Sequence, residues 1–186
     1  MNKFPEILQM DEFELVRRRP TFHNAEMIFS LLDKNRTYFE QWLGWVNEIK
    51  SLEDCFGWLR NQDDTSCVYF IFKDCNMIGC VGFVKINEKA KSLDLGYWLV
   101  EEANGQGIIH LMIKLLEPVA FDSDWEVLRI GCDVLNKKSK KVAEKLGYVF
   151  EGTIRHGEPY PDGRRYDNSF FSKLKSEWLA EQTLKI

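Results

Sequence analysis

A short polar turn between two apolar segments has the residue types and spacing of an anion-binding site. The turn, Glu101–Gly107, carries two glycines, Gly105 and Gly107, separated by one residue. Before it, Leu93–Val100 is aromatic and apolar, as a buried strand is, and from Ile108 onward apolar residues recur at helical spacing. A strand, a glycine turn and a helix in this order direct free backbone N–H groups and the positive end of the helix dipole at one point. The pattern therefore predicts a site for an anion such as a pyrophosphate.

The glycine spacing excludes two well-known phosphate-binding loops. A dinucleotide fingerprint needs a third glycine three residues after Gly107, where the sequence has His110. A Walker loop needs Lys-Ser or Lys-Thr after its last glycine, and Ile108-Ile109 stands there instead. A Gly-x-Gly turn also occurs as a plain connection from strand to helix, because glycine serves any turn with positive φ. On its own, the turn leaves both interpretations open.

A second segment, Leu128–Thr153, begins as a strand and continues as a lysine-rich helix. The strand, predicted at Val127–Asp133, is expected to lie parallel to Leu93–Leu99 through a crossover helix. The lysine-rich helix is predicted at Lys137–Leu146, with Gly147 as its C′ residue. Two strand-to-helix units in succession indicate a mixed α/β fold.

Together, the two segments resemble the GNAT superfamily of acyl-CoA-dependent N-acyltransferases. Asn104–Ile109 is similar to the family's pyrophosphate loop, although its first residue, usually Gln or Arg, is asparagine and its last, usually small, is isoleucine. Asn136-x-x-Ser139, followed by Ala143–Tyr148, is similar to the second family signature. The resemblance covers nearly the whole chain, from about residue 15 to residue 178.

The opening helices narrow the resemblance to the branch that contains ribosomal-protein-serine N-acetyltransferases. The segments that carry it are Asn35-Arg36, Trp42–Val46 and Ser51–Asp54. In this family the helices overhang the acyl-transfer site, which implies that Trp42 and Trp45 line the acceptor pocket. Aromatic residues in such helices also belong to ordinary cores, so both interpretations stand.

The resemblance implies that acetyl-CoA is the acyl donor and where its parts lie. The pyrophosphate would bind backbone N–H groups of the loop, and the pantetheine arm would pair with the preceding strand where the two parallel strands splay apart. The thioester oxygen would point at a backbone N–H near Leu99. The implied cofactor-binding residues are Trp98, Leu99, Val100, Asn104, Gly105, Gln106, Gly107, Ile108, Ile109, Asn136, Ser139, Lys141 and Lys145.

A cluster of lysines on the second helix has two interpretations. Its members are Lys137, Lys138, Lys140, Lys141 and Lys145. Such a run is usually a solvated face. Five like charges in nine residues repel one another, however, so the 3′-phosphate of coenzyme A is an equally good explanation.

Amide formation from a thioester needs a polarised carbonyl, a base for the amine's proton and an acid for the leaving thiolate. Ser139 occupies the family position of the acid, although a serine there also suits an ordinary helix start from an Asn136 cap. For the base, Glu158 is the first choice and Asp94 the second, and His156 or an ordered water chain are alternatives. An acyl-enzyme on Cys132 is less favoured than a buried, inert thiol, because no His or acid is paired with it in the sequence.

The other segments predict a mostly antiparallel sheet flanked by helices and splayed at one parallel pair, in a single domain of residues 1–186. The further predicted elements are a first strand at Glu12–Arg17, helices at Asn24–Asn35 and Thr37–Trp45, a helix capped by Ser51 and Asp54, a hairpin of Cys67–Lys73 and Met77–Asn87, closing strands at Tyr148–His156 and Tyr166–Lys175, and a polar tail at Ser176–Ile186. Asn24 is the expected N-cap of the first helix. Pro161-Asp162-Gly163 predicts the turn between the closing strands.

Composition limits the class of protein. A net charge of −4 argues against a protein that coats nucleic acid, so no DNA binding is expected. Five cysteines without Cys-x-x-Cys spacing predict no metal site and no disulfide framework. Met1–Asp11 has no apolar core of the length typical of a signal peptide, and no apolar run approaches the length expected of a membrane span. These features favour a cytoplasmic enzyme with reduced thiols.

The leading hypothesis is an N-acetyltransferase that uses acetyl-CoA on a primary amine, by direct attack in a ternary complex. The branch resemblance favours a protein N-terminal amine of the ribosomal-protein type. Small amines such as polyamines, amino sugars or amino acids are an alternative, and so is a non-catalytic acyl-CoA sensor. Exposed strand edges and aromatic-rich helices also suggest a homodimer.

Overall fold

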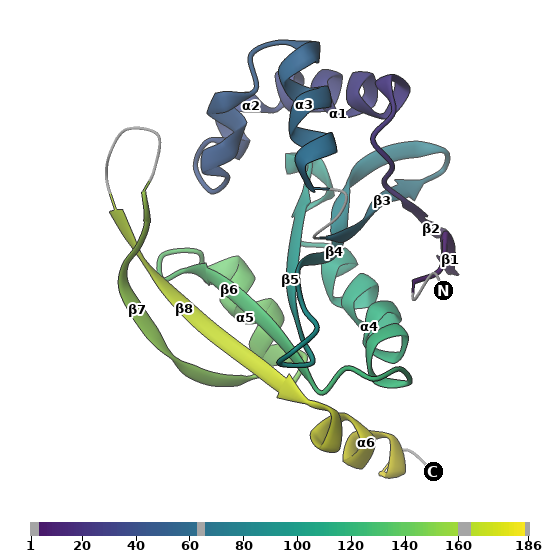
Figure 1. The fold of residues 1–186 in the computed structure, drawn as a ribbon, viewed down its shortest axis with the longest axis vertical. Coiled ribbons are helices and arrows are strands. Elements are labelled where there is room, and N and C mark those ends of the chain that lie inside the picture. The colour runs from purple at the N-terminus through teal and green to yellow at the C-terminus, as the bar shows by residue number, and fades with distance from the viewer. Residues whose placement is uncertain (1–3, 63–65, 160–164, 185–186) are drawn as a thin grey trace.

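The computed structural model describes residues 4–62, 66–159 and 165–184. Its strands are β1 (Ile7–Met10), β2 (Phe13–Arg17), β3 (Cys67–Lys73), β4 (Asn76–Asn87), β5 (Ser92–Leu99), β6 (Val127–Asp133), β7 (Val149–Pro159) and β8 (Arg165–Leu174). They form one sheet in the order β1-β2-β3-β4-β5-β6-β8-β7 (Figure 1). Every neighbouring pair is antiparallel except β5 and β6. This arrangement confirms the predicted mixed α/β fold and its parallel pair.

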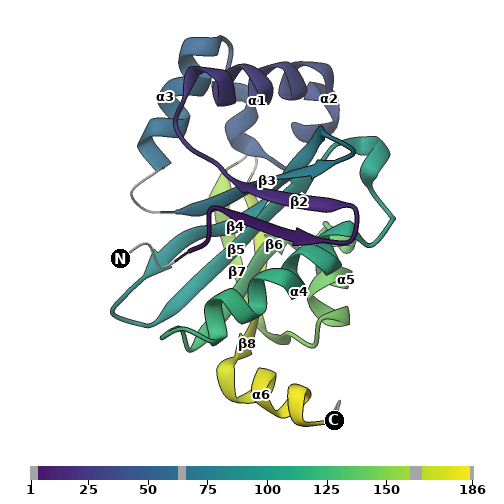
Figure 2. The ribbon, with the colours of Figure 1, turned by 90° about the vertical axis from the view of Figure 1, so that its right-hand side faces the viewer.

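Helices lie against the sheet and at the two ends of the molecule. They are α1 (Phe22–Lys34), α2 (Arg36–Phe39), α3 (Leu52–Gln62), α4 (Ile108–Phe121), α5 (Lys137–Lys145) and α6 (Lys175–Thr183), with 3-10 turns η1 (Gly44–Glu48) and η2 (Glu101–Ala103). Figures 1 and 2 show α1, α2 and α3 together at one end of the molecule and α6 at the other, beside the C-terminus. Within α4 the apolar stripe Met112, Ile113 and Leu116 is fully buried, as its helical spacing predicts.

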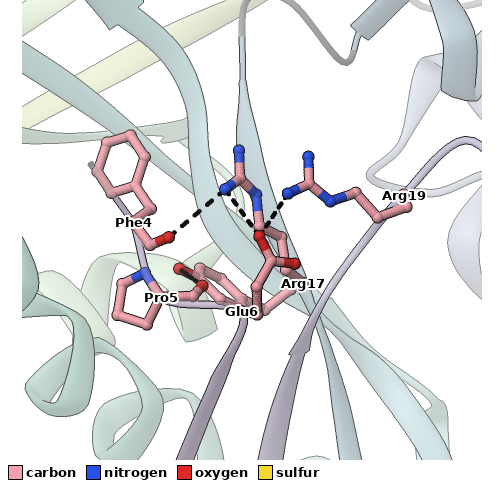
Figure 3. A network of polar contacts seen from close by, with 6 residues as sticks. Phe4, Pro5, Glu6, Arg17 and Arg19 are labelled. Carbon is pink, nitrogen blue, oxygen red and sulfur yellow. Dashed lines mark hydrogen bonds and ion pairs between the residues drawn. The ribbon is translucent and has the colours of Figure 1, made fainter. Parts of the chain in front are cut away.

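The sheet begins one strand earlier than the predicted start at Glu12–Arg17. β1 has only four residues, which alternate between exposed and half-buried positions, so its pattern is too weak to stand out in the sequence. Contacts outside the strand hold this N-terminal segment on the sheet (Figure 3). The Tyr69 hydroxyl donates to the Pro5 carbonyl at 2.9 Å, and the Arg17 guanidinium lies 3.3 Å from the Glu6 carboxylate.

The first helix starts before its predicted cap. Thr21, not Asn24, is the N-cap residue of α1, and its hydroxyl accepts a hydrogen bond from the Asn24 backbone N–H at 3.1 Å. The Asn24 side chain instead donates to the Arg19 carbonyl. Both residues suit caps, and the sequence alone does not separate them when they lie three positions apart.

The second predicted helix, Thr37–Trp45, is divided in the structure. α2 is a single turn, the chain becomes non-helical at Leu43, and η1 follows from Gly44. A glycine at this position weakens a continuous helix. The next helix is confirmed with its capping box, since Ser51 and Asp54 exchange side-chain-to-backbone hydrogen bonds.

The predicted polar tail forms helix α6. The Glu177 carboxylate accepts from the Leu174 backbone N–H at 2.8 Å, and the Trp178 ring packs 5.5 Å from that of Phe121. Upstream, β7 and β8 pair on both sides of the predicted Pro161-Asp162-Gly163 turn, which lies outside the described residues. Among the described helices, none combines the length and apolar character that crossing a membrane requires.

Candidate active site

The parallel strands β5 and β6 separate part-way along, as the resemblance implies. Their pairing ends at Leu95 and Ile130, although β5 continues to Leu99 and β6 to Asp133. A cavity of about 1090 Å³ occupies this opening. Its lining includes residues of the η2–α4 loop, of α5 and of the α2–α3 region. The volume is large enough for a ligand of cofactor size.

The backbone of Leu99 faces the opening. The Val100 N–H donates to the Ile78 carbonyl of β4 at 2.9 Å, and the Trp98 carbonyl also faces β4, at Gly79. Because consecutive residues of a strand direct their backbone groups to opposite sides, the Leu99 N–H and carbonyl point away from β4 and toward the splay. Of the predicted strand residues, Leu99 therefore presents its amide to a ligand, while the Val100 amide is already paired.

The loop before α4 has the conformation of an anion site. Gly105 and Gly107 have φ of 82° and 78°, a region that glycine adopts without strain. Gly107 is the N-cap residue of α4 and has no side chain to cap the first N–H groups of the helix. A Cβ on either glycine would meet no described protein atom within 4 Å. The side chains of Ile108 and Ile109 are buried, so contact with a ligand falls mainly to the backbone.

Two polar side chains of the same loop stabilise the turn. The Asn104 amide donates to the Val100 carbonyl at 2.7 Å, and the Gln106 amide donates to the Glu102 carbonyl at 3.1 Å. Both bonds close the chain back onto η2. Asparagine in place of the family's usual Gln or Arg is therefore accommodated as a structural residue.

The lysine cluster of α5 divides between two faces of the helix. Lys138, Lys141 and Lys145 line the cavity, whereas Lys137 and Lys140 do not appear among its described lining residues. Spacings of three and four residues place the first group on one helix face. This division supports the anion interpretation for three of the five lysines, including the two that the resemblance implied.

His110, on the first turn of α4, lies in the same positive environment. Burial is the main cause that holds its pKa below the usual value, and the charges of Lys114, Lys145 and Lys173 act in the same direction. Its imidazole therefore stays neutral at neutral pH, and the lysines supply the positive charge at this end of the cavity.

Neutralising the cavity-facing lysines is expected to weaken coenzyme A more than dephospho-coenzyme A. Lys138→Gln, Lys141→Gln and Lys145→Gln each remove one charge near the predicted 3′-phosphate. An exposed ion pair contributes at most about 1 kcal/mol, so each loss is several-fold at best. Calorimetry with both ligands measures the difference, and Lys137→Gln with Lys140→Gln is the matched control. An equal loss for both ligands would show that the lysines form only a solvated face.

Ser139 lies in the first turn of α5 and is buried within the cavity wall. The Asn136 side chain caps the helix by accepting from the Ser139 backbone N–H at 3.1 Å. The Ser139 hydroxyl takes no part in that cap and lies 2.7 Å from the Tyr97 hydroxyl. The cap is therefore compatible with Ser139 as the acid for the thiolate and with Asn136 as a cofactor-binding residue.

The Cys132 thiol is buried next to the Ser139 hydroxyl. Burial raises its pKa, and the contact with Ser139 only partly offsets this effect. A thiol with a raised pKa is a poor nucleophile, which agrees with the inert alternative favoured from the sequence.

The candidate bases occupy different places. Asp94 lies in the part of β5 that is still paired with β6, its carboxylate 3.9 Å from the Arg129 guanidinium, and it is not among the described residues that line the cavity. Glu158 is on β7, in register with Tyr166 of β8, and Tyr166 lines the cavity. His156 is exposed, with a left-handed backbone held by the Asp167 carboxylate. Each candidate thus lies beside a cavity-lining residue, Glu158 beside Tyr166 and Asp94 beside Leu95, and the strand geometry does not separate them.

Aromatic residues of the α2–α3 region form another part of the cavity wall. The Trp45 and Trp58 rings stack with centroids 4.4 Å apart, and the buried Arg18 guanidinium lies 4.8 Å above Trp58. Trp42 is partly exposed and also lines the cavity. Phe39 contacts Trp98 edge-on at 5.1 Å. The aromatic residues thus belong both to the core and to the cavity wall, which agrees with the two interpretations of the sequence, a core role and a pocket role.

Sequence reasoning did not find Tyr97 or Arg18 as cavity residues. Tyr97 follows the apolar alternation of its strand and has no local feature that sets it apart. Arg18 belongs to the run Arg17-Arg18-Arg19, whose like charges are typical of the solvated end of a strand. Its burial arises from α3, whose Trp58 covers it, and that contact spans forty residues of sequence.

Comparisons with known proteins agree with this geometry. A family model described as "Acetyltransferase (GNAT) domain" matches residues 14–149. The ribosomal-protein-serine acetyltransferase of Escherichia coli (strain K12) is 30% identical over 142 residues, which are 73% of this chain and 79% of that protein.

Solved structures of related proteins contain the expected donor. A structure of RimL, a ribosomal L7/L12 alpha-N-protein acetyltransferase, in complex with coenzyme A has a TM-score of 0.84 and 25% identity, covering 92% of this chain and 99% of that one. The microcin C7 self-immunity acetyltransferase MccE, in complex with acetyl-CoA and AMP, has a TM-score of 0.79 and 27% identity, covering 89% of this chain and 93% of that one. The chain therefore belongs to the GNAT family and is an acetyltransferase.

Proposed function

We propose that the protein transfers the acetyl group of acetyl-CoA to a primary amine, and that the amine is a protein N-terminus of the ribosomal-protein type. One observation carries the proposal: a single cavity joins the uncapped start of α4, the splay of β5 and β6, and the aromatic residues of the α2–α3 region, with Ser139 in its wall. Ribosomal-protein acetyltransferases among the relatives support the choice of acceptor.

The donor is held along the length of the cavity. The pyrophosphate lies on the N–H groups from Gly105 to Ile109, where the dipole of α4 favours an anion. The lysines of α5 are near enough to accompany the 3′-phosphate. The pantetheine arm lies in the splay, and the Leu99 N–H stabilises the negative charge that develops on the thioester oxygen.

The acceptor enters beside these aromatic residues and attacks the thioester directly. Its nitrogen gives a proton to Glu158, or failing that to Asp94 or water. When the carbon–sulfur bond breaks, the electron pair goes to sulfur, and Ser139 gives its hydroxyl proton to the thiolate. The raised pKa of the Cys132 thiol supports direct transfer over an acyl-cysteine intermediate.

Measuring thiol release with a panel of amines tests the function. Peptides with the N-terminal sequences of ribosomal proteins are expected to be better acceptors than polyamines, amino sugars or free amino acids. Intersecting initial-velocity lines are expected for a ternary complex, and parallel lines would contradict it. A small amine as the best acceptor would select the alternative substrate class. Tight acetyl-CoA binding without thiol release for any amine would favour the sensor.

Glu158→Gln is expected to lower kcat/KM and to remove or shift the acidic limb of its pH profile. A base must be deprotonated to accept the amine's proton, so activity falls as the pH drops below its pKa, and glutamine has no such titration. The pH profile of kcat/KM for the variant and for Asp94→Asn provides the measurement. Full activity with an unaltered profile in Glu158→Gln would transfer the role to Asp94 or to water.

Location and assembly complete the proposal. Five free thiols suit the reducing cytoplasm, where ribosomal proteins are made. The edge strand β7 exposes the apolar side chains of Val149, Phe150 and Ile154, which supports the homodimer hypothesis. Sedimentation at several protein concentrations tests the assembly.

A further inference from the structure

The Tyr97 hydroxyl makes the closest polar contact of Ser139. It lies 2.7 Å from the Ser139 hydroxyl oxygen and 3.5 Å from the Ser139 carbonyl oxygen. The two residues come from β5 and α5, and both line the cavity. The Ser139 backbone N–H is already bound to Asn136, so the helix start is fixed independently of this contact.

Either hydroxyl of this pair can be the donor, and the surroundings favour Tyr97 in that role. Burial raises the pKa of Tyr97 well above the usual value for a phenol, and the contact with Ser139 only partly offsets the effect. Tyr97 therefore keeps its proton throughout the working pH range. The thiol of Cys132 and the phenol of Tyr148 are titratable neighbours of the pair, and burial raises the pKa of both. These two neighbours are thus neutral, and a phenol is a better hydrogen-bond donor than a serine hydroxyl.

We propose that Tyr97 is a positioning residue that holds the Ser139 hydroxyl as a proton donor to the leaving thiolate. This inference rests on the proposed role of Ser139. A serine hydroxyl has one proton and rotates freely, and early in a helix it also bonds to backbone carbonyls. A permanent donor on one lone pair of its oxygen leaves the Ser139 proton free to point into the cavity, where the sulfur lies.

The same hydrogen bond stabilises the transition state. As the carbon–sulfur bond breaks, sulfur takes the electron pair and the Ser139 proton, and negative charge appears on the serine oxygen. The Tyr97 O–H donates to that oxygen, and hydrogen bonds to charged groups are stronger than bonds between neutral ones. Ser139 regains a proton from water once coenzyme A leaves as the thiol, and Tyr97 keeps its own proton throughout.

Tyr97→Phe is expected to lower kcat roughly tenfold, the effect of one hydrogen bond, while the KM for acetyl-CoA changes less than about twofold. In a Ser139→Ala background the same change is expected to have no further effect on kcat, because Tyr97 acts only through that hydroxyl. Tyr69→Phe is the matched control, since it removes a buried phenol that is bonded to Pro5 and is not among the described residues that line the cavity.

The double-mutant cycle separates this inference from the proposed function. A tenfold fall for Tyr97→Phe in both backgrounds, or no fall in either, would overturn the positioning role. A raised KM with unchanged kcat would also overturn it, because Tyr97 would then only shape the cavity. Wild-type kcat in Ser139→Ala alone would instead refute the proposed acid. Thermal unfolding of each variant shows that the comparison is made between folded proteins.

Discussion

Gly107→Val is expected to weaken acetyl-CoA binding at least about 100-fold, because at least two charge-assisted hydrogen bonds to the pyrophosphate are lost. Gly107 is the N-cap residue of α4, and its backbone has a φ of 78°. The position where its Cβ would stand is open, with no described protein atom within 4 Å. A valine side chain therefore fills space that is empty in the protein and that the phosphate needs.

Strain is a second effect of this substitution and has to be separated from the first. A β-branched residue at positive φ is unfavourable by roughly 1–2 kcal/mol, which destabilises the protein and alters the loop. Gly107→Asn is the matched variant, because asparagine tolerates this conformation and still places a side chain in the same space. Both variants are expected to lose binding, while Gly107→Asn keeps a nearly unchanged Tm.

Calorimetry with acetyl-CoA measures the affinity, and thermal unfolding without ligand measures the fold. Unchanged affinity in a folded Gly107→Val or Gly107→Asn protein would place the pyrophosphate elsewhere. Loss in the valine variant alone would show that strain in the loop, and not occupation of the phosphate space, accounts for the effect.

The parts of the site that depend on local sequence were predictable. Two glycines between a strand and a helix define the loop, because positive φ and open N–H groups are properties of a few consecutive residues. The Asn136 cap of α5 was found for the same reason, since its partner lies only three residues ahead. The parallel pair of β5 and β6 followed from the order of strand, helix and strand.

Features that depend on distant contacts were not predictable in this way. Tyr97 and Ser139 are 42 residues apart, and only the folded sheet brings their hydroxyls together. Arg18 belongs to a basic run that resembles a solvated strand end until Trp58 covers it. β1 is stabilised by its neighbours more than by its own pattern, as the contact between Tyr69 and Pro5 illustrates.

Ser139→Ala is expected to lower kcat by about 10²–10⁴-fold while the Kd of acetyl-CoA changes little. Positioned proton transfer has this magnitude, and the thiolate leaves poorly without it. In the proposed binding mode, acetyl-CoA is held by backbone N–H groups of another loop and by the lysines of α5, so we expect the affinity not to depend on this hydroxyl. The cap of α5 survives as well, because Asn136 binds the backbone N–H of residue 139, which alanine retains.

The substitution has a structural cost that a control must match. Without the serine hydroxyl, the half-buried Tyr97 side chain keeps only the longer contact of its hydroxyl to the carbonyl of residue 139, a loss of about 1 kcal/mol in stability. Ser172→Ala is the matched control, since it removes a buried serine hydroxyl of β8 that is bonded to Glu151, outside the cavity. It is expected to lower Tm by a similar amount and to leave kcat unchanged.

Single-turnover kinetics decide whether the hydroxyl acts in the chemical step. Enzyme and acetyl-CoA are mixed first, and adding the amine starts the reaction. Thiol release is expected to be slow in Ser139→Ala and to have the normal rate in Ser172→Ala. If Ser139→Ala retains the wild-type rate while departure of the thiolate limits the reaction, the serine is only a helix-start residue. A slow step that is restored by supplying an external acid would support proton donation, because the defect would then lie in the missing proton and not in the position of the thioester.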